Sequence, residues 1–384
     1  MPDFFEFQVR PRLLYRQGLV EELGHEIAQR PERRMFIVGD MGVQRAGLLD
    51  RVVKGVSGSA EIVGVFCDVP ANSSVLSVER GAALAREAGA DVILAIGGGS
   101  PIDTAKCMRM LVSEGGALRD YEGYNILTRP LVPMIAVPTT AGTGSEVTPF
   151  AVIRDEEAHL KMTFGSPFLA PDLAILDPEM TRALPMPLTA ATGMDALTHA
   201  IEAFASREAN PISDALALQA IDLISNNLRA ATHTPDDMQA RGQLLIGSAM
   251  AGMAFASALL GVVHAMAHAV GGTFPLHHGL LNSILLPHGM RFNSTTVPNR
   301  FSRIARAMGV NAGGRAEEDV IEDGILAVAA LAADCGLPSR LRDLEMIEDA
   351  LPALAEVALT DAAIFTNPRE AMTEDILALM RAAW

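Results

Sequence analysis

The first part of the chain alternates between strand-like and helix-like segments, and this order restricts the fold more than any other feature of the sequence. Continuous apolar runs predict buried strands, and apolar residues at helical spacing predict helices between them. Strands that alternate with helices need right-handed crossovers, so we expect a parallel, doubly wound sheet that binds ligands beyond the carboxyl ends of its strands. The expected elements are strands at 5–10 and 12–17, a helix at 18–30, a strand at 33–40, a helix at 41–56, a strand at 60–66, a helix at 73–89, a strand at 91–99, a helix at 102–111 and a strand at 131–138.

The pattern changes near residue 187, beyond which almost every segment is helical in period. A chain of 384 residues also exceeds the usual size of a single domain. We therefore expect an α/β N-terminal domain over residues 1–187 and an all-α C-terminal domain over residues 188–384. The clearest helical stretches of the second domain are 188–206, 212–231, 236–270, 297–309, 317–336 and 368–384.

Candidate metal ligands are concentrated between residues 195 and 278, which contain five of the nine histidines. Asp195 and His199 are four residues apart, so on a helix they lie on the same face and could hold one ion between them. A lone histidine on an apolar helix is more often a core or capping residue, but several together need partners, and a shared cation would serve them. Nitrogen and oxygen ligands without thiolate suit Zn²⁺ or Fe²⁺. The other histidines of this stretch are His264, His268, His277 and His278.

A glycine run at the end of the strand predicted at 91–99 is a candidate phosphate-binding turn. Gly97, Gly98, Gly99 and Ser100 are followed by Pro101 and a helical segment. Glycines let the backbone approach a phosphate, and the helix that follows offers free N–H groups and a positive dipole end. An ordinary strand-to-helix turn is the alternative, because this run is not a GxGxxG motif.

Two further strand ends have the polar character of a nucleotide site. Asp40 ends the strand predicted at 33–40, where its carboxylate could accept both ribose hydroxyls and would repel a 2′-phosphate, which favours NAD over NADP. A surface aspartate in a turn is the alternative. Thr139 and Thr140 begin a segment rich in hydroxyls and glycines, which we interpret as the second wall of a nucleotide cleft.

The composition excludes several classes of partner. A net charge of −16 argues against nucleic acid and anionic membranes, because both need a basic surface. Three widely spaced cysteines argue against a disulfide framework and favour a reducing compartment. The N-terminus lacks the features of a signal peptide, and no uncharged apolar stretch reaches the roughly 18 residues of a membrane span. We therefore expect a cytoplasmic protein.

A nucleotide site and a metal site together indicate hydride transfer. The metal would polarise a substrate oxygen, so that a hydride can pass between the adjacent carbon and a nicotinamide. His268, one helical turn after His264, is the candidate proton relay or substrate-orienting residue, and His277 is a weaker candidate.

Four segments together resemble the iron-containing, group III alcohol dehydrogenases, and the similarity extends over essentially the whole chain. These segments are GGGSPIDTAK, PTTAGTGSEVT, AATGMDALTHAIEAF and the run from GVVHAMAH through HHG to NSILLPHGMRFN. The resemblance implies a dinucleotide-binding domain, a helical domain and a cleft between them. It also implies at least a homodimer.

The resemblance further implies roles for individual residues. It places His268 near the nicotinamide and the substrate, and Phe255 in the lining of the pocket. The residues matched to the family's divalent-metal ligands are Asp195, His199, His264 and His278. The residues matched to the family's NAD site are Asp40, Gly97, Gly98, Gly99, Ser100, Thr139, Thr140, Thr148, Phe150 and Lys161.

The chain departs from the family pattern at three places. Residues 70–74 read Pro-Ala-Asn-Ser-Ser where some members carry a Pro-Asn-Pro-Thr segment that contacts the cofactor. His277 stands where proline is common, and Leu280 and Leu281 stand where Val-Ala is usual. These differences leave the identity of the substrate open.

The resulting hypothesis is an NAD(H)-dependent, Fe²⁺-type alcohol dehydrogenase or aldehyde reductase that acts on small alcohols or diols. One alternative is a non-redox metal- and NAD-dependent lyase of the dehydroquinate-synthase type, which would form product without net consumption of NADH. Another is a catalytically silent NAD-binding or assembly protein, which a failure to bind any metal would support.

Overall fold

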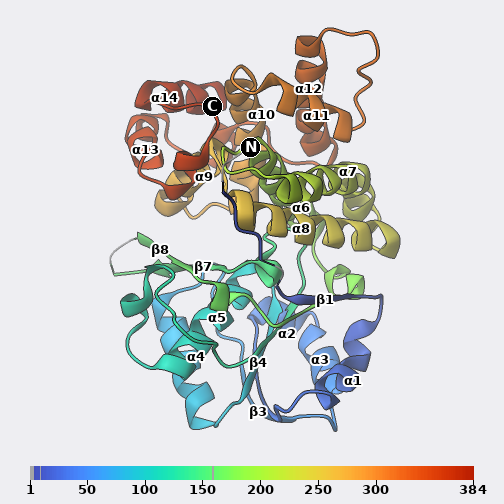
Figure 1. Ribbon diagram of the computed structural model, residues 1–384, viewed down its shortest axis with the longest axis vertical. Coiled ribbons are helices and arrows are strands. Elements are labelled where there is room, and N and C mark those ends of the chain that lie inside the picture. The colour runs from blue at the N-terminus through green and yellow to red at the C-terminus, as the bar shows by residue number, and fades with distance from the viewer. Residues whose placement is uncertain (1–3, 9, 158–159) are drawn as a thin grey trace. The chain divides into compact units, whose positions relative to one another are not determined.

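The computed structural model describes residues 4–8, 10–157 and 160–384 (Figure 1). These residues form two compact units. The sheet unit comprises Gln8–Thr140 and Gly144–Leu184, and the helical unit comprises Ala141–Thr143, Pro185–Trp384 and the described residues up to Phe7. The assignment of NAD binding to one domain and metal binding to the other stays a prediction.

The sheet unit contains the expected parallel sheet. Six strands lie in the order β1-β9-β6-β4-β2-β3, and every neighbouring pair is parallel. Parallel neighbours that are not consecutive in the chain need crossover connections, so the doubly wound prediction is confirmed. The bounds are β1 Arg12–Tyr15, β2 Arg34–Val38, β3 Glu61–Phe66, β4 Val92–Gly97, β6 Met134–Pro138 and β9 Leu173–Leu176.

Helices cover both faces of this sheet because both faces of its strands are apolar. Met35 and Ile37 of β2 pack into one buried cluster with residues of α1 and α3, whereas Phe36 and Val38 pack into another with residues of α4 and α5. Side chains alternate along a strand, so a continuous apolar run supplies both layers. The helices of the sheet unit are α1 Leu23–Ala28, α2 Met41–Arg45, α3 Leu48–Val56, α4 Val75–Glu87 and α5 Gly99–Glu114, with 3-10 helices at Leu19–Glu22, Leu118–Tyr121, Ser145–Val147, Pro167–Leu169 and Pro178–Thr181.

Several predicted elements of this unit were wrong or missed. The single helix expected at 41–56 is two helices, because Gly47 adopts a left-handed φ of 72° between them. The strand expected at 5–10 is not formed by the described residues of that segment. Strand β9 was not predicted. A second sheet was also not predicted, and its three strands are β5 Gly123–Tyr124, β7 Phe150–Asp155 and β8 Leu160–Gly165.

The helical unit contains no strand among its described residues, as its periodicity predicted. Close packing begins at α6, where a Cβ on Gly193 would lie 2.3 Å from Leu228 of α7, so the absence of a side chain lets the two helices approach. The helices are α6 Met186–Ala205, α7 Pro211–His233, α8 Met238–Ala258, α9 Val262–Thr273, α10 His278–Ser294, α11 Pro298–Ala307, α12 Glu317–Asp334, α13 Leu351–Ala358 and α14 Thr373–Ala382, with 3-10 helices at Leu341–Leu344, Glu348–Ala350 and Ala362–Thr366.

The long helix expected at 236–270 is broken into α8 and α9. Leu259 takes a φ of 59° and a ψ of −164°, which ends α8, and Gly261 precedes α9. The two helices meet at 100°. Among the described residues, no single helix is both long and apolar enough to cross a bilayer, although this bent pair passes that test of length and composition when taken together.

Candidate metal centre

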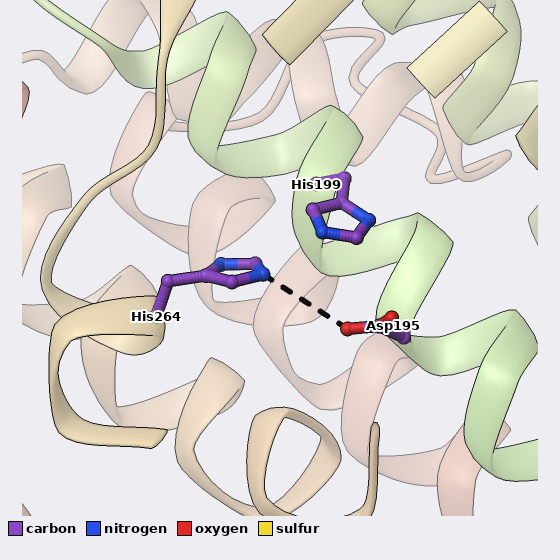
Figure 2. Close-up of side chains that lie close together, drawn as sticks. All are labelled: Asp195, His199 and His264. Atoms are coloured by element: carbon purple, nitrogen blue, oxygen red, sulfur yellow. Dashed lines mark ion pairs between the residues drawn. The ribbon is translucent and has the colours of Figure 1, made fainter. Parts of the chain in front are cut away.

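Two helices bring three of the predicted metal ligands together (Figure 2). Asp195 and His199 lie one turn apart on α6, and His264 lies in the first turn of α9. One potential ligand atom of each residue lies within 4.8 Å of those of the other two. His264 Nε2 is 3.9 Å from Asp195 Oδ1. A carboxylate and two imidazoles are thus within reach of a single ion.

The fourth predicted ligand, His278, is the first residue of α10, and its Nε2 lies 3.6 Å from Asp195 Oδ1. Asn282, one turn later, marks the place where the ligand atoms converge. Its Nδ2 lies 2.7 Å from Asp195 Oδ1, 3.1 Å from His264 Nε2 and 3.0 Å from His278 Nε2. Three potential ligand atoms therefore face one small region.

The charges in this cluster suit a cation. Asp195, His199 and His264 are buried. Burial would raise the pKa of Asp195, but His199, His278, His264 and the Asn282 amide lower it to about 2. Burial lowers the pKa of His264 well below its usual value, so its ring is neutral. An ionised carboxylate beside a neutral imidazole is the protonation state in which these groups bind a metal.

The donor set fits a divalent transition-metal ion. Within the described part of the chain, His199 Nδ1 and Asn282 Oδ1 are buried polar atoms without a hydrogen-bond partner. Buried polar atoms are normally paired, so unpaired ones next to a converging set of donors indicate a missing partner. One carboxylate with three imidazoles and no thiolate is a combination that Zn²⁺ and Fe²⁺ accept.

Two side chains that sequence reasoning missed support this cluster. Glu202 Oε2 lies 2.6 Å from His264 Nδ1. Burial raises the pKa of Glu202 to about 7, although backbone N–H groups at the start of α9 lower it. A cation in the cluster would favour the ionised form of this carboxyl group. Asn282 was the other omission. Phe255 of α8, which the resemblance placed in the pocket lining, stacks on His199 with ring centroids 4.5 Å apart.

His268, the predicted proton relay, lies beside the ligand cluster. Its ring stacks on that of His278 with centroids 5.2 Å apart, and its Nδ1 lies 2.9 Å from Asp361 Oδ2. His268 is partly exposed, as a group that exchanges protons with a substrate has to be. His277 is exposed and precedes α10 as its N-cap residue. The catalytic roles of both histidines stay predictions.

The predicted phosphate-binding turn joins β4 to α5. Gly97 has a φ of 148°, and a Cβ there would lie 2.5 Å from the ring of Pro101, so a larger residue does not fit. Gly98 is the N-cap residue of α5, and Gly99 and Ser100 begin its first turn. The first turn of a helix has N–H groups without helical partners, and these suit a phosphate.

Thr139 and Thr140 lie beside this turn because β6 pairs with β4. Gly97 is the register partner of Pro138, and the Thr139 N–H donates a hydrogen bond of 2.9 Å to the Gly97 carbonyl. A Cβ on Gly98 would lie 3.3 Å from the Thr140 side chain. The two segments that were expected to line a nucleotide site are therefore adjacent.

Asp40 follows β2, the strand next to β4. Its Oδ1 accepts a hydrogen bond of 2.8 Å from the Val43 N–H, so Asp40 is the N-cap residue of α2. Asp40 therefore has the structural role in a turn that was the alternative to nucleotide binding. Its contact with a ribose stays a prediction.

Thr148 and Phe150 surround a buried lysine. Lys106 Nζ donates hydrogen bonds to Ser145 Oγ at 2.8 Å, Thr148 Oγ1 at 3.3 Å and the Phe150 carbonyl at 2.6 Å. Asp103 Oδ1 lies 3.7 Å from the same ammonium. Burial lowers the pKa of Lys106 to about 8, against the raising effect of Asp103. We call these five residues the lysine cluster.

Lys161, the last residue matched to the NAD site, lies on β8 opposite Arg154 of β7. Phe150 pairs with Gly165, four residues along the same two strands. At the usual rise per residue these positions are about 13 Å apart. The backbone therefore does not place Lys161 next to Phe150.

Comparison with known proteins agrees with this geometry. A family model described as iron-containing alcohol dehydrogenase matches residues 11–178, and one described as the C-terminal part of the Fe-containing alcohol dehydrogenase family matches residues 189–384. The 1,3-propanediol dehydrogenase of Klebsiella pneumoniae is 41% identical over 354 residues, which is 92% of each chain. The NAD-dependent methanol dehydrogenase of Bacillus methanolicus is 36% identical over 383 residues, which is 100% of each chain.

Two further matches concern the proposed substrate class and the fold. Lactaldehyde reductase of Escherichia coli (strain K12) is 38% identical over 370 residues, which is 96% of each chain. The crystal structure of a 1,3-propanediol oxidoreductase superposes with a TM-score of 0.97 at 39% identity, and the alignment covers 99% of this chain and 100% of that one.

Proposed function

The chain belongs to the family of iron-containing alcohol dehydrogenases and is an oxidoreductase, and on that premise we propose that it interconverts small alcohols or diols and their aldehydes with NAD(H). The observation that carries the proposal is the convergence of Asp195, His264 and His278 on the Asn282 amide. The ligand set that we propose for the ion is Asp195, His199, His264 and His278.

The chemistry needs both cofactors. When bound, a divalent ion supplies a Lewis acid that lowers the pKa of a substrate hydroxyl, and NAD supplies the hydride acceptor. Fe²⁺ and Zn²⁺ accept the same ligands, and we propose Fe²⁺ in keeping with the family.

The chain's own residues would bind and orient these groups. Asp195 and the imidazoles give the ion a fixed position, and Glu202 and Asp361 hold His264 and His268 by their Nδ1 atoms. With Nδ1 so engaged, His268 Nε2 is the atom available to pass a proton to or from the substrate.

The nucleotide would be bound by the sheet unit. The turn at Gly97–Ser100 would contact the pyrophosphate through backbone N–H groups, and Thr139 and Thr140 would add hydroxyls beside it. Asp40 would accept the hydroxyls of the adenosine ribose, which favours NAD over NADP. Thr148, Phe150 and Lys161 are proposed contacts on the strength of the family resemblance.

The test is NADH oxidation by metal-stripped protein resupplied anaerobically with Fe²⁺ or Zn²⁺, measured with lactaldehyde, glycolaldehyde, propanal and butanal. We expect turnover that requires the added metal, because it polarises the carbonyl in the reverse reaction. The order of the four rates would rank the pocket by chain length and by tolerance of a hydroxyl. Retained metal with no NADH oxidation by any of these aldehydes would reject small aldehydes as substrates.

The lyase alternative is not favoured, because the family models and the named relatives are oxidoreductases. We further propose a cytoplasmic homodimer. Three free cysteines support a reducing compartment, and the family resemblance supports the dimer. Light scattering after size exclusion would measure the mass, and a monomer at micromolar concentration would reject the dimer.

A further inference from the structure

One buried carboxylate connects the two helices that carry the proposed ligands. Glu202 lies on α6, three residues after His199 and seven after Asp195, so all three side chains are on one face of the helix. We propose that Glu202 positions His264 for metal binding by fixing which ring nitrogen faces the ligand cluster. The inference rests on the proposed function.

Glu202 contacts one of the two nitrogens of the His264 ring. Glu202 Oε2 lies 2.6 Å from His264 Nδ1, and both side chains are buried. With Glu202 ionised, as a cation in the cluster favours, its oxygens only accept, so the ring proton resides on Nδ1 and Nε2 keeps its lone pair. Such carboxylate–histidine pairs commonly orient imidazole ligands in metal sites.

The other nitrogen of the ring faces Asp195. His264 Nε2 lies 3.9 Å from Asp195 Oδ1, and neither atom can donate to the other when the proton is on Nδ1. If the proton moved to Nε2, that N–H would point toward the Asp195 carboxylate and occupy the direction of the ion. Glu202 therefore keeps two acceptors facing each other, which is the arrangement that a cation stabilises.

Glu202 contacts the backbone at the start of α9 as well as the ring. Glu202 also accepts hydrogen bonds from the N–H groups of Val263, at 2.7 Å, and His264, at 3.2 Å. The N-cap residue of α9, Gly261, has no side chain to do this, and a Cβ there would lie 3.0 Å from Glu202 Oε1. Glycine thus admits the carboxylate, which caps α9 from another helix and sets where its first turn begins.

A capping role and a ring-orienting role can be separated because another side chain also caps α9. Asn367 Oδ1 accepts a hydrogen bond of 3.0 Å from the Val262 N–H. Asn367 is as buried as Glu202, but its side chain pairs with Asn293 and the Arg369 carbonyl rather than with the His264 ring. Asn367→Ala therefore loosens the same helix start and leaves the ring orientation alone.

The experiment measures the dissociation constant of Zn²⁺ by competition with a chromophoric chelator, for the full-length wild type, Glu202→Gln and Glu202→Ala. We expect Glu202→Gln, which keeps the size of the side chain, to bind Zn²⁺ about 10- to 100-fold more weakly. We expect Glu202→Ala to bind at least as weakly as Glu202→Gln. NAD binding, followed by quenching of protein fluorescence or by calorimetry, should stay unchanged in both variants.

Two control variants complete the design. Asn367→Ala should lower the melting temperature and keep the Zn²⁺ affinity within about threefold of wild type. Asp361→Asn alters the comparable carboxylate–histidine bond that Asp361 makes to His268, which lies on the same helix as His264. This variant should also bind Zn²⁺ within about threefold of wild type.

The outcomes are distinct. Zn²⁺ affinity of Glu202→Gln within threefold of wild type overturns the inference, and so does an equal loss in Asn367→Ala, which would make the effect one of helix capping. If Glu202→Ala does not fold, Glu202→Gln decides alone. A wild-type protein that binds no Zn²⁺ would instead reject the metal site of the proposed function, whichever result the variants give.

Discussion

Two buried polar clusters, one in each unit, differ in where their positive charge comes from. In the lysine cluster of the sheet unit, the Lys106 ammonium lies among oxygen acceptors that include Ser145 Oγ and the Phe150 carbonyl. In the helical unit, Asp195 faces His264 and His278, whose rings bear lone pairs when neutral. The first cluster contains its own cation, whereas the cation that we propose for the second would come from solution.

The titration behaviour of the two clusters reflects this difference. Burial lowers the pKa of Lys106 to about 8, although Asp103 and Glu146 oppose the change. The charged form of Lys106 nonetheless predominates at neutral pH, and its ammonium donates hydrogen bonds to several oxygens. Asp195, with its pKa lowered to about 2, is ionised across the physiological range. One site should therefore be stable by itself, and the other should respond to metal.

The largest expected effect removes a ligand from the helical unit. His264→Ala should abolish metal retention and reduce turnover at least about a thousandfold, or ~4 kcal/mol in the barrier, because the metal provides the main charge stabilisation. Metal content after dialysis and kcat/KM are the measurements, and NAD binding should remain. The control is His233→Ala, because His233 is an exposed histidine of α7 in the same unit. Unchanged turnover in His264→Ala would remove this residue from the site.

The next effect removes the cation of the sheet unit. Lys106→Met removes the ammonium that faces Asp103 and donates to several oxygens, and breaking such a buried pair costs about 3–5 kcal/mol of unfolding free energy. Denaturant titration of the variant measures the loss, and exposed Lys54→Met should be neutral. A loss of less than about 1 kcal/mol in the free energy of unfolding would mean that water or a rearrangement replaces the ammonium. The lysine cluster would then not depend on its own cation, and the difference between the two clusters would disappear.

A smaller effect comes from metal itself. At a free concentration 100 times the dissociation constant, an ion that binds only the folded state adds about 2.7 kcal/mol. Chelation should therefore lower the melting temperature of the wild type, and the shift should vanish in His264→Ala. A chelator that destabilised both proteins equally would be acting somewhere other than the proposed site.

The smallest effect concerns the choice of nucleotide. Asp40→Gly should raise the ratio of kcat/KM with NADPH to that with NADH by about tenfold, or ~1.4 kcal/mol, since it removes a charge that repels a 2′-phosphate. Glycine is tolerated at an N-cap position for a few tenths of a kcal/mol, so the fold should persist. No relative gain would show that another residue sets the preference.

Sequence reasoning found the residues whose spacing has a direct physical meaning. The alternation of strand-like and helix-like segments in the first 140 residues predicted the parallel sheet. The four-residue interval from Asp195 to His199 predicted that both lie on one face of a helix. Glu202 was missed although it shares that face, because a glutamate in an apolar helix has no motif until its partner is known. That partner, the first turn of α9, is 62 residues away from it in the chain.

The remaining errors have a common cause. The break at Leu259 requires a φ of 59°, which leucine does not favour, so the residue type gives no sign of it. Strands β5, β7 and β8 form a separate sheet, and β9 pairs with β1 and β6, which lie in distant segments of the chain. Local patterns do not contain such information, since tertiary contacts decide these conformations.

The wide separation of the proposed ligands along the chain also has a consequence for biosynthesis. Asp195 and His199 leave the ribosome together, but His264 follows 65 residues after His199, and His278 follows another 14 residues later. A nascent chain can offer an ion only two donors until α9 and α10 have been made and have docked. Complete coordination of the proposed ion would therefore have to follow the docking of α9 and α10 onto α6.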